Sequence, residues 1–200
     1  MSEPHKPRRP SFRDPNALEV LGDATDPIAA LHAAHETAAV LVRRGRSADD
    51  PATVARLVAL VDEVGISDLA DLWASRPARS LPGALWRLYL LREWVVKDPT
   101  GAAREYAAGI RFTEPNHAVA GVDPAGPDEV RRVVDEILRG VFAGDFAVAL
   151  ERAAALCHVV ASGRADVTEG HRAVIQAGRL QSMAEDLSAC AHLWRSGALQ

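Results

Sequence analysis

Lysine is nearly missing from this 200-residue sequence, which has two lysines against 21 arginines. A GC-rich genome is one explanation, and selection of arginine for contacts with anions or nucleic acid is the other. Cysteine occurs only at Cys157 and Cys190, and there is no CxxC pair. This excludes a disulfide framework and zinc sites of the CxxC type. Each cysteine lies on the apolar face of its own predicted helix, so we expect reduced thiols and a cytoplasmic protein.

The short motifs of common enzyme classes are also missing. The sequence contains no GxGxxG, no Walker loop and no GxSxG, so we predict no catalytic residues and no cofactor. No run of 18 apolar residues occurs, and the N-terminal segment lacks the apolar core of a signal peptide, so we expect no membrane partner. The net charge of −4 and the pI of about 6.0 argue against non-specific binding of nucleic acid.

Alanine dominates what is present, with 37 residues, and no segment alternates between apolar and polar residues as a strand does. Alanine has the highest helix propensity, and Asp-Pro pairs, a capping serine and glycines mark helix starts and stops. The segment 113–126 is predicted as a long loop. The predicted helices cover about 27–45, 51–64, 67–75, 81–97, 99–110, 127–140, 145–162 and 168–195.

These signals predict an all-α fold, a single compact multi-helix bundle of about eight helices over residues 21–200. We expect helices 81–97 and 168–195 at its centre. The alanine-rich apolar stripe of helix 168–195 packs either inside this core or as the seam of a dimer. A short, proline-rich tail precedes the bundle at residues 1–20.

The tail carries local positive charge, and we expect it either to be a solvated leader or to dock on an acidic partner. Its candidate interaction residues are Arg8, Arg9 and Arg13.

Arg92 is the residue that the helical pattern explains least, because it falls in the middle of the apolar stripe of helix 81–97. A guanidinium keeps its charge and is rarely buried without a partner. One explanation is structural: an internal ion pair, with Glu36 or Asp62, or a side chain that reaches along the apolar surface to water. The other is a pocket in which Arg92 binds a carboxylate or phosphate of a ligand.

Two more polar residues lie on apolar stripes: His35 in helix 27–45 and Gln176 in helix 168–195. Each is interpreted either as a hydrogen-bonded core residue or as part of a ligand site with Arg92. His35 belongs to the run His32–Glu36, but the helical wheel separates its histidines and no second cluster has metal-ligand spacing, so no metal site is predicted.

Residues 53–76 have the shape of a helix-turn-helix, with a helix, a glycine turn and a short second helix. Asp68 and Asp71 begin the second helix, where phosphate groups would repel them, which disfavours nucleic acid as a partner.

The leading functional hypothesis is a non-enzymatic cytoplasmic adaptor or regulatory protein that acts through protein–protein interaction, by a partner or by self-association through helix 168–195. The first alternative is a ligand sensor or enzyme that binds an acidic small molecule at Arg92 and His35, with Gln176. The second is a DNA-binding transcriptional regulator that uses the 53–76 corner and the basic tail.

Overall fold

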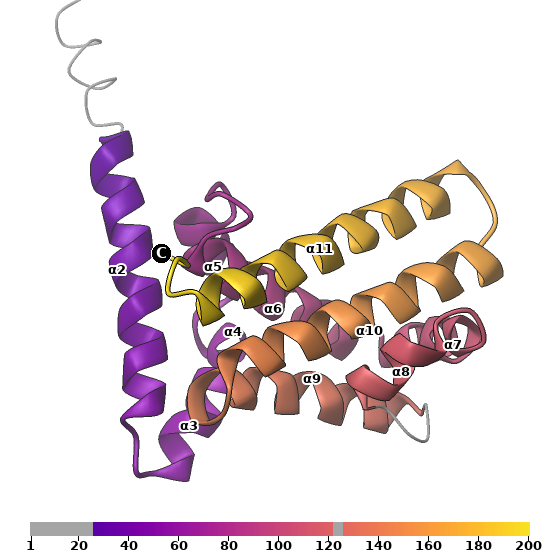
Figure 1. Cartoon of the computed structure of the whole chain (residues 1–200), viewed down its shortest axis with the longest axis horizontal. Coiled ribbons are helices and arrows are strands. Elements are labelled where there is room, and N and C mark those ends of the chain that lie inside the picture. Colours follow the sequence, from indigo (N-terminus) through magenta and orange to yellow (C-terminus); the bar gives the residue numbers. More distant parts are fainter. Residues whose placement is uncertain (1–25, 122–125) are drawn as a thin grey trace, which may run out of the picture.

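The computed structural model describes residues 26–121 and 126–200, and in these residues the chain forms ten helices and no strand. The all-α prediction is confirmed (Figure 1). In chain order the helices are α2 (Pro27–Arg46), α3 (Pro51–Val58), α4 (Leu60–Val64), α5 (Ile66–Trp73), α6 (Leu81–Lys97), α7 (Pro99–Ile110), α8 (Glu114–Ala120), α9 (Pro127–Ala143), α10 (Phe146–Val167) and α11 (His171–Arg195).

Side-chain caps start five of these helices where the sequence indicated. The capping side chain accepts a hydrogen bond from a backbone N–H of the first turn, which satisfies a donor that the helix itself leaves free. The predicted bounds of α6 and α7 are therefore correct. The capping residues are Asp26, Asp50, Ser80, Asp98 and Asp145.

The predicted loop 113–126 is wrong in its first half, because α8 lies there with a proline in its first turn and Ala120 buried against the core. Helix 51–64 is divided at Ala59 into α3 and α4. The last helix starts only at His171, because Gly170 has a φ of 101°, which a helix does not allow.

Three glycines that were predicted to end helices lie inside them instead. Gly45, Gly140 and Gly163 are helical residues of α2, α9 and α10. Gly45 and Gly163 are buried at helix crossings, where the missing side chain lets two helices approach. Tertiary packing thus overrides the local stop signal.

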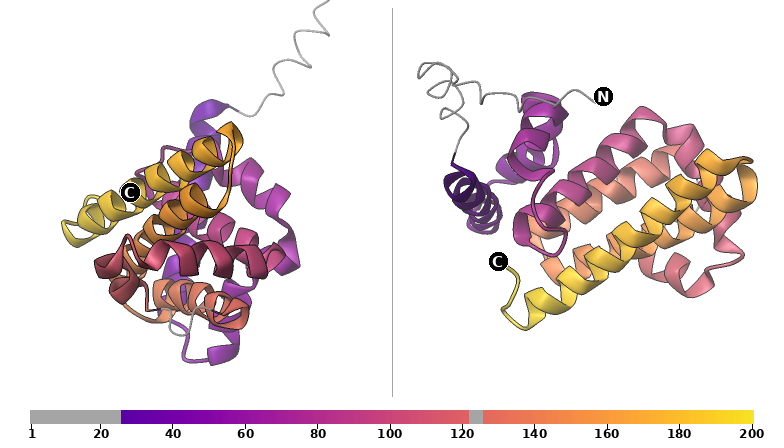
Figure 2. Two further views of the ribbon diagram at one scale, coloured as in Figure 1. Left: turned by 90° about the vertical axis from the view of Figure 1, so that its right-hand side faces the viewer. Right: turned by 90° about the horizontal axis from the view of Figure 1, so that it is seen from above.

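The centre of the fold is α10, which contacts α11, α7, α8 and α9. α10 and α11 lie side by side and antiparallel (Figures 1 and 2). By length and composition alone α10 could span a membrane, but 72% of its most apolar window is buried inside the fold, as in the core helix of a globular protein. The sequence predicted α6 and α11 at the centre of the fold. This is right for α6, which is largely buried. α11 lies on the outside of α10 (Figure 1).

The apolar stripe of α11 is buried within the chain, against α10. Of the two uses that the sequence allowed for this stripe, packing inside the core is the one observed. A partner of α11 would have to contact a different face of this helix.

Two glycines set the distance between α7 and α10. A β-carbon on Gly109 would overlap the carbonyl oxygen of Val159, and one on Gly163 would overlap the carbonyl oxygen of Glu105. Both obstacles are backbone atoms, which cannot rotate away as a side chain can. The α7–α10 crossing therefore depends on both glycines.

We expect Gly109→Ala and Gly163→Ala each to lower the free energy of unfolding by about 1–3 kcal/mol, because the added methyl group must push two helices apart. Urea denaturation followed by circular dichroism measures this. Gly178→Ala in α11 is the control: a β-carbon there has no neighbour within 4 Å, so it should raise stability by up to about 1 kcal/mol. Equal effects at the three positions would contradict the account of the crossing.

Candidate functional site

Arg92 lies at the junction of α6, α4 and α9, with 8% of its side chain exposed. Its Nε donates to Oδ1 of Asp135 at 2.7 Å. Its Nη1 and Nη2 donate to the two carboxylate oxygens of Asp62 at 3.2 and 3.0 Å. This is the planar, two-pronged geometry that a guanidinium prefers. The internal partner Asp62 is thus one of the two expected from the sequence, while Glu36 plays no part.

Burial opposes the charge of Arg92, but hydrogen bonds and attraction from Asp62 and Asp135 outweigh burial, so the pKa of Arg92 lies above its usual value. Three of the five N–H donors of the guanidinium bind Asp62 and Asp135, and these two carboxylates supply the negative charge that an acidic ligand would otherwise bring. Arg92 is therefore a structural link between three helices, and the reason for expecting a ligand there is removed.

The other two predicted ligand residues lie apart from Arg92 and from each other. His35 is half-buried on α2, its Nδ1 2.9 Å from the carbonyl oxygen of Leu31, beside a cavity of about 500 Å³ at the start of α6. Gln176 is exposed on α11 rather than part of the core, and it lines a different cavity. The structure thus does not bring the three residues into one site. The tail arginines Arg8, Arg9 and Arg13 lie outside the described residues.

A groove lies between α6 and α11. It consists of two adjoining cavities of about 510 and 250 Å³, which share Leu90, Arg179 and Met183. Most of the residues that line these cavities belong to α6 and α11. The other lining residues are Ala74, Trp86, Arg87, Leu91, Trp94, Arg164, Ile175, Gln176, Gly178, Leu180, Ser182 and Asp186.

The tryptophans of α6 form part of the wall of this groove. Trp86 and Trp94 are half-buried; they pack against the core and also line the groove. Together with Leu90, they form one face of α6 with a spacing of four residues. This spacing is the signal in the sequence that could have indicated the groove.

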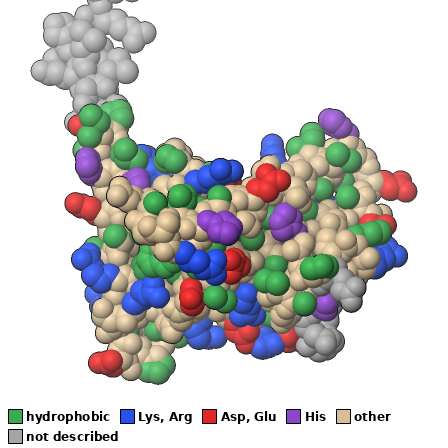
Figure 3. Space-filling model, viewed as in Figure 1, with side chains coloured by type: hydrophobic (Ala, Val, Ile, Leu, Met, Phe, Trp, Pro, Cys, Tyr) green, Lys and Arg blue, Asp and Glu red, His purple; other side chains and the backbone are tan. Residues whose placement is uncertain are grey.

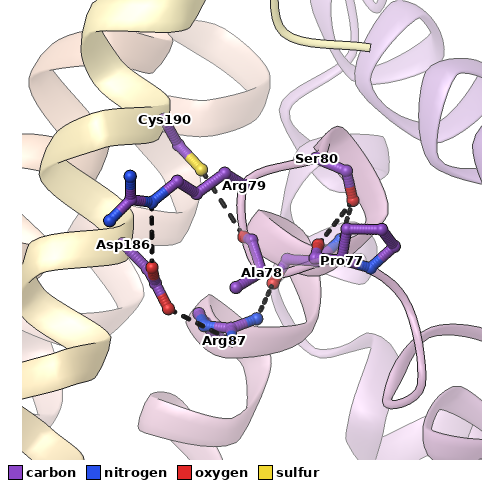
Figure 4. Close-up of polar contacts among 8 residues, drawn as sticks. Pro77, Ala78, Arg79, Ser80, Arg87, Asp186 and Cys190 are labelled. Carbon is purple, nitrogen blue, oxygen red and sulfur yellow. Dashed lines mark hydrogen bonds and ion pairs between the residues drawn. The ribbon is translucent and has the colours of Figure 1, made fainter.

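Ion pairs close the groove at the start of α6 (Figure 4). Asp186 of α11 accepts a hydrogen bond from Nε of Arg79 at 3.1 Å and one from Nη2 of Arg87 at 3.4 Å. The Arg87 Nη1 also donates to the carbonyl oxygen of Gly83 at 3.0 Å. The Sγ of Cys190 lies 3.7 Å from the carbonyl oxygen of Ala78. These contacts tie α11 to the chain that leads into α6.

A second ion pair lies at the other end of the groove. Arg164 of α10 donates from Nε to Glu105 at 2.9 Å, and its Nη2 lies 2.8 Å from the same oxygen. Both side chains are nearly enclosed, and the Arg164 guanidinium lies 5.0 Å from the centre of the Trp94 ring. This is a cation–π contact, which fixes the ring at the groove wall.

Between the two ion pairs lie Gly178 and Arg179. A β-carbon on Gly178 would meet no atom within 4 Å, and its φ is not positive, so neither packing nor backbone geometry requires glycine. Glycine inside a helix costs about 1 kcal/mol relative to alanine. Within the described part of the chain, the exposed Arg179 has no hydrogen-bond or ion-pair partner. The middle of the groove is therefore open and carries a free positive charge.

Other candidate chemistry is limited. Among the residues that the structure describes, no three histidine, cysteine or acidic side chains are placed to hold a metal ion. Cys157 and Cys190 are free and buried as predicted, and burial raises the pKa of Cys157 to about 12 and that of Cys190 to about 11. Neither is a reactive thiolate at neutral pH. His117, which lies in the segment predicted as a loop, is half-buried in α8 with its Nδ1 2.9 Å from the Tyr106 hydroxyl.

No protein-family model matches the chain, and no curated protein sequence or solved structure matches it either. The function of the groove must therefore be inferred from the side chains that line it.

The Arg92 network predicts that removing its two carboxylates lowers the free energy of unfolding more than removing the guanidinium. Asp62→Asn/Asp135→Asn leaves a buried guanidinium without a carboxylate, which should cost about 3–5 kcal/mol of unfolding free energy. Arg92→Met should cost at most about 2 kcal/mol, because methionine fills similar space and the two aspartates, 51% and 38% exposed, can be hydrated. Urea denaturation at pH 7 measures both.

Asp166→Asn is the control for this comparison. It removes the partner of the exposed Arg111 and should change the unfolding free energy by less than about 1 kcal/mol. If Arg92→Met proves more costly than the double aspartate variant, the network does not act by neutralising a buried charge.

Proposed function

We propose that this protein is a non-enzymatic cytoplasmic adaptor or regulator that binds a helical segment of a partner protein in the α6–α11 groove. The groove walls are rich in tryptophan, leucine and methionine, with arginines among them. Aromatic residues, methionine and arginine are enriched at protein interfaces, and methionine adapts to partners of different shape.

The dimensions of the groove support a short helix as the occupant. Its lining extends over residues 86–94 of α6 and 175–186 of α11, which is about 12 and 16 Å at 1.5 Å per residue. Two to three turns of a helix have this length. An amphipathic helix that places its apolar face in such a groove is a recurring mode of peptide recognition.

Gly178 is the observation that carries the proposal. It lies inside a 25-residue helix, where an alanine would stabilise the protein without meeting any neighbour. A side chain at this position would extend into the larger cavity, which Gly178 lines. With glycine at this position, the space beside α11 is left open for another molecule.

The acidic-ligand alternative moves from Arg92 to this same groove, because the cavities of about 510 and 250 Å³ are close in size to small-molecule sites.

The DNA-binding alternative gains no support. Acidic and basic side chains are interspersed on the face in Figure 3, and Asp68 and Asp71 are exposed on the short helix that would enter the major groove.

The test uses Gly178→Leu, which fills the groove, and Val174→Leu as the control on the same helix, at a position that is 64% exposed and outside the groove. Peptides of about 16 residues from a random helix-patterned display library are selected on the wild-type protein. We expect a set of peptides that binds the wild type and Val174→Leu but binds Gly178→Leu at least about tenfold more weakly, a loss of about 1.4 kcal/mol.

The stability of Gly178→Leu is the control for this experiment. Gly178→Leu should be at least as stable as the wild type, so loss of binding cannot result from unfolding. If every selected peptide binds Gly178→Leu as well as it binds the wild type, the groove is not a binding site for helices and the proposal is wrong.

A further inference from the structure

We infer that the occupant of the groove is an acidic segment of a partner protein, with carboxylates beside its apolar face. This inference rests on the proposed function and adds the chemistry of the partner. Its basis is the balance of charge along the groove, which differs in sign from that of the whole chain.

Positive charge exceeds negative charge in and beside the groove. Among the residues that line the groove and the ion-pair partners of these residues, there are four arginines and two carboxylates, those of Asp186 and Glu105. Asp186 already accepts hydrogen bonds from two arginines, and Glu105 is enclosed by Arg164. Neither carboxylate is free to attract a basic partner. The four arginines are Arg79, Arg87, Arg164 and Arg179.

The chain as a whole has a net charge of −4. A local excess of positive charge on an acidic protein focuses the electrostatic attraction for anionic partners at one place. The groove therefore carries a local charge opposite in sign to the net charge of the chain.

Arg179 determines where the partner's carboxylate would lie. Arg179 lines both cavities, and its side chain has no hydrogen-bond or ion-pair partner among the described residues. It lines one cavity together with Trp86 and the other together with Trp94. An apolar residue of the partner fits between Trp86 and Met183, and an aspartate or glutamate three or four residues away reaches Arg179.

Hydrogen bonding makes this contact favourable. The free guanidinium can donate two parallel hydrogen bonds to one carboxylate, in the same geometry that Arg92 shows with Asp62. The apolar walls exclude part of the water and strengthen the interaction over that of an exposed ion pair. A basic or neutral segment would gain only the apolar contacts.

The test uses the groove-dependent peptides, those that Gly178→Leu loses. Their binding to the wild type, to Arg179→Glu and to Arg131→Glu is measured by fluorescence anisotropy at low and high salt. Arg131 is an exposed arginine of α9, away from the groove, and Arg131→Glu makes the same change in net charge. We expect the peptides to be enriched in aspartate and glutamate, and Arg179→Glu to weaken them about tenfold or more, whereas Arg131→Glu changes binding by less than about twofold.

The results separate this inference from the proposed function. Groove-dependent peptides that are neutral or basic, or that bind Arg179→Glu as well as the wild type, would overturn the acidic partner but leave the helix-binding groove intact. The absence of any groove-dependent peptide would overturn both. If decanoate, a small acidic amphiphile, binds the groove and no groove-dependent peptide does, the site is one for small molecules and the protein partner is wrong.

Discussion

The ion network of Arg92, Asp62 and Asp135 is the interaction on which the arrangement of this protein depends. It fastens α6 to α4 and α9 from the inner face of α6. Beside it, the buried Tyr89 donates from its hydroxyl to the carbonyl oxygen of Leu57 at 2.6 Å, so that α3 is joined to α6 as well. Burial raises the pKa of Tyr89, and this hydroxyl stays protonated. Polar contacts of this kind are directional, so they determine the rotation of α6 as well as its position.

The rotation of α6 has a consequence for its other face. Leu90 is about 200° from Arg92 around the helix, so fixing Arg92 inward turns Leu90 and the two neighbouring tryptophans toward α11. α11 packs against α10 through its alanine-rich stripe. The two helices are tied together near Asp186 and are left apart beyond it. The groove is thus the space between α6, which is held by α4 and α9, and α11, which packs against α10.

Much of this architecture could be predicted from the sequence, because its signals are local. Asp26, Ser80 and Asp98 cap helices wherever they are placed, and Arg92 needed an acidic partner in any fold. The glycines could not be interpreted in this way, since Gly45 and Gly163 end a helix in isolation but allow a close crossing in the folded chain. The groove was missed for a related reason: it is formed by residues about 90 positions apart, and only the relative placement of α6 and α11 reveals it. Asp135 was not predicted as a partner of Arg92, because the two residues are 43 positions apart and no local pattern in the sequence links them.

Quenching of tryptophan fluorescence tests the central claim, an open groove with excess positive charge, most directly. In a Trp194→Phe variant, Trp73 is fully buried and the half-buried Trp86 and Trp94 of the groove dominate quenching. With acrylamide as the neutral reference, iodide should quench more strongly than caesium, and Arg179→Glu should reduce this preference. Stronger quenching by caesium, as the net charge of −4 would produce by itself, or no quenching by any of the three, would contradict the account.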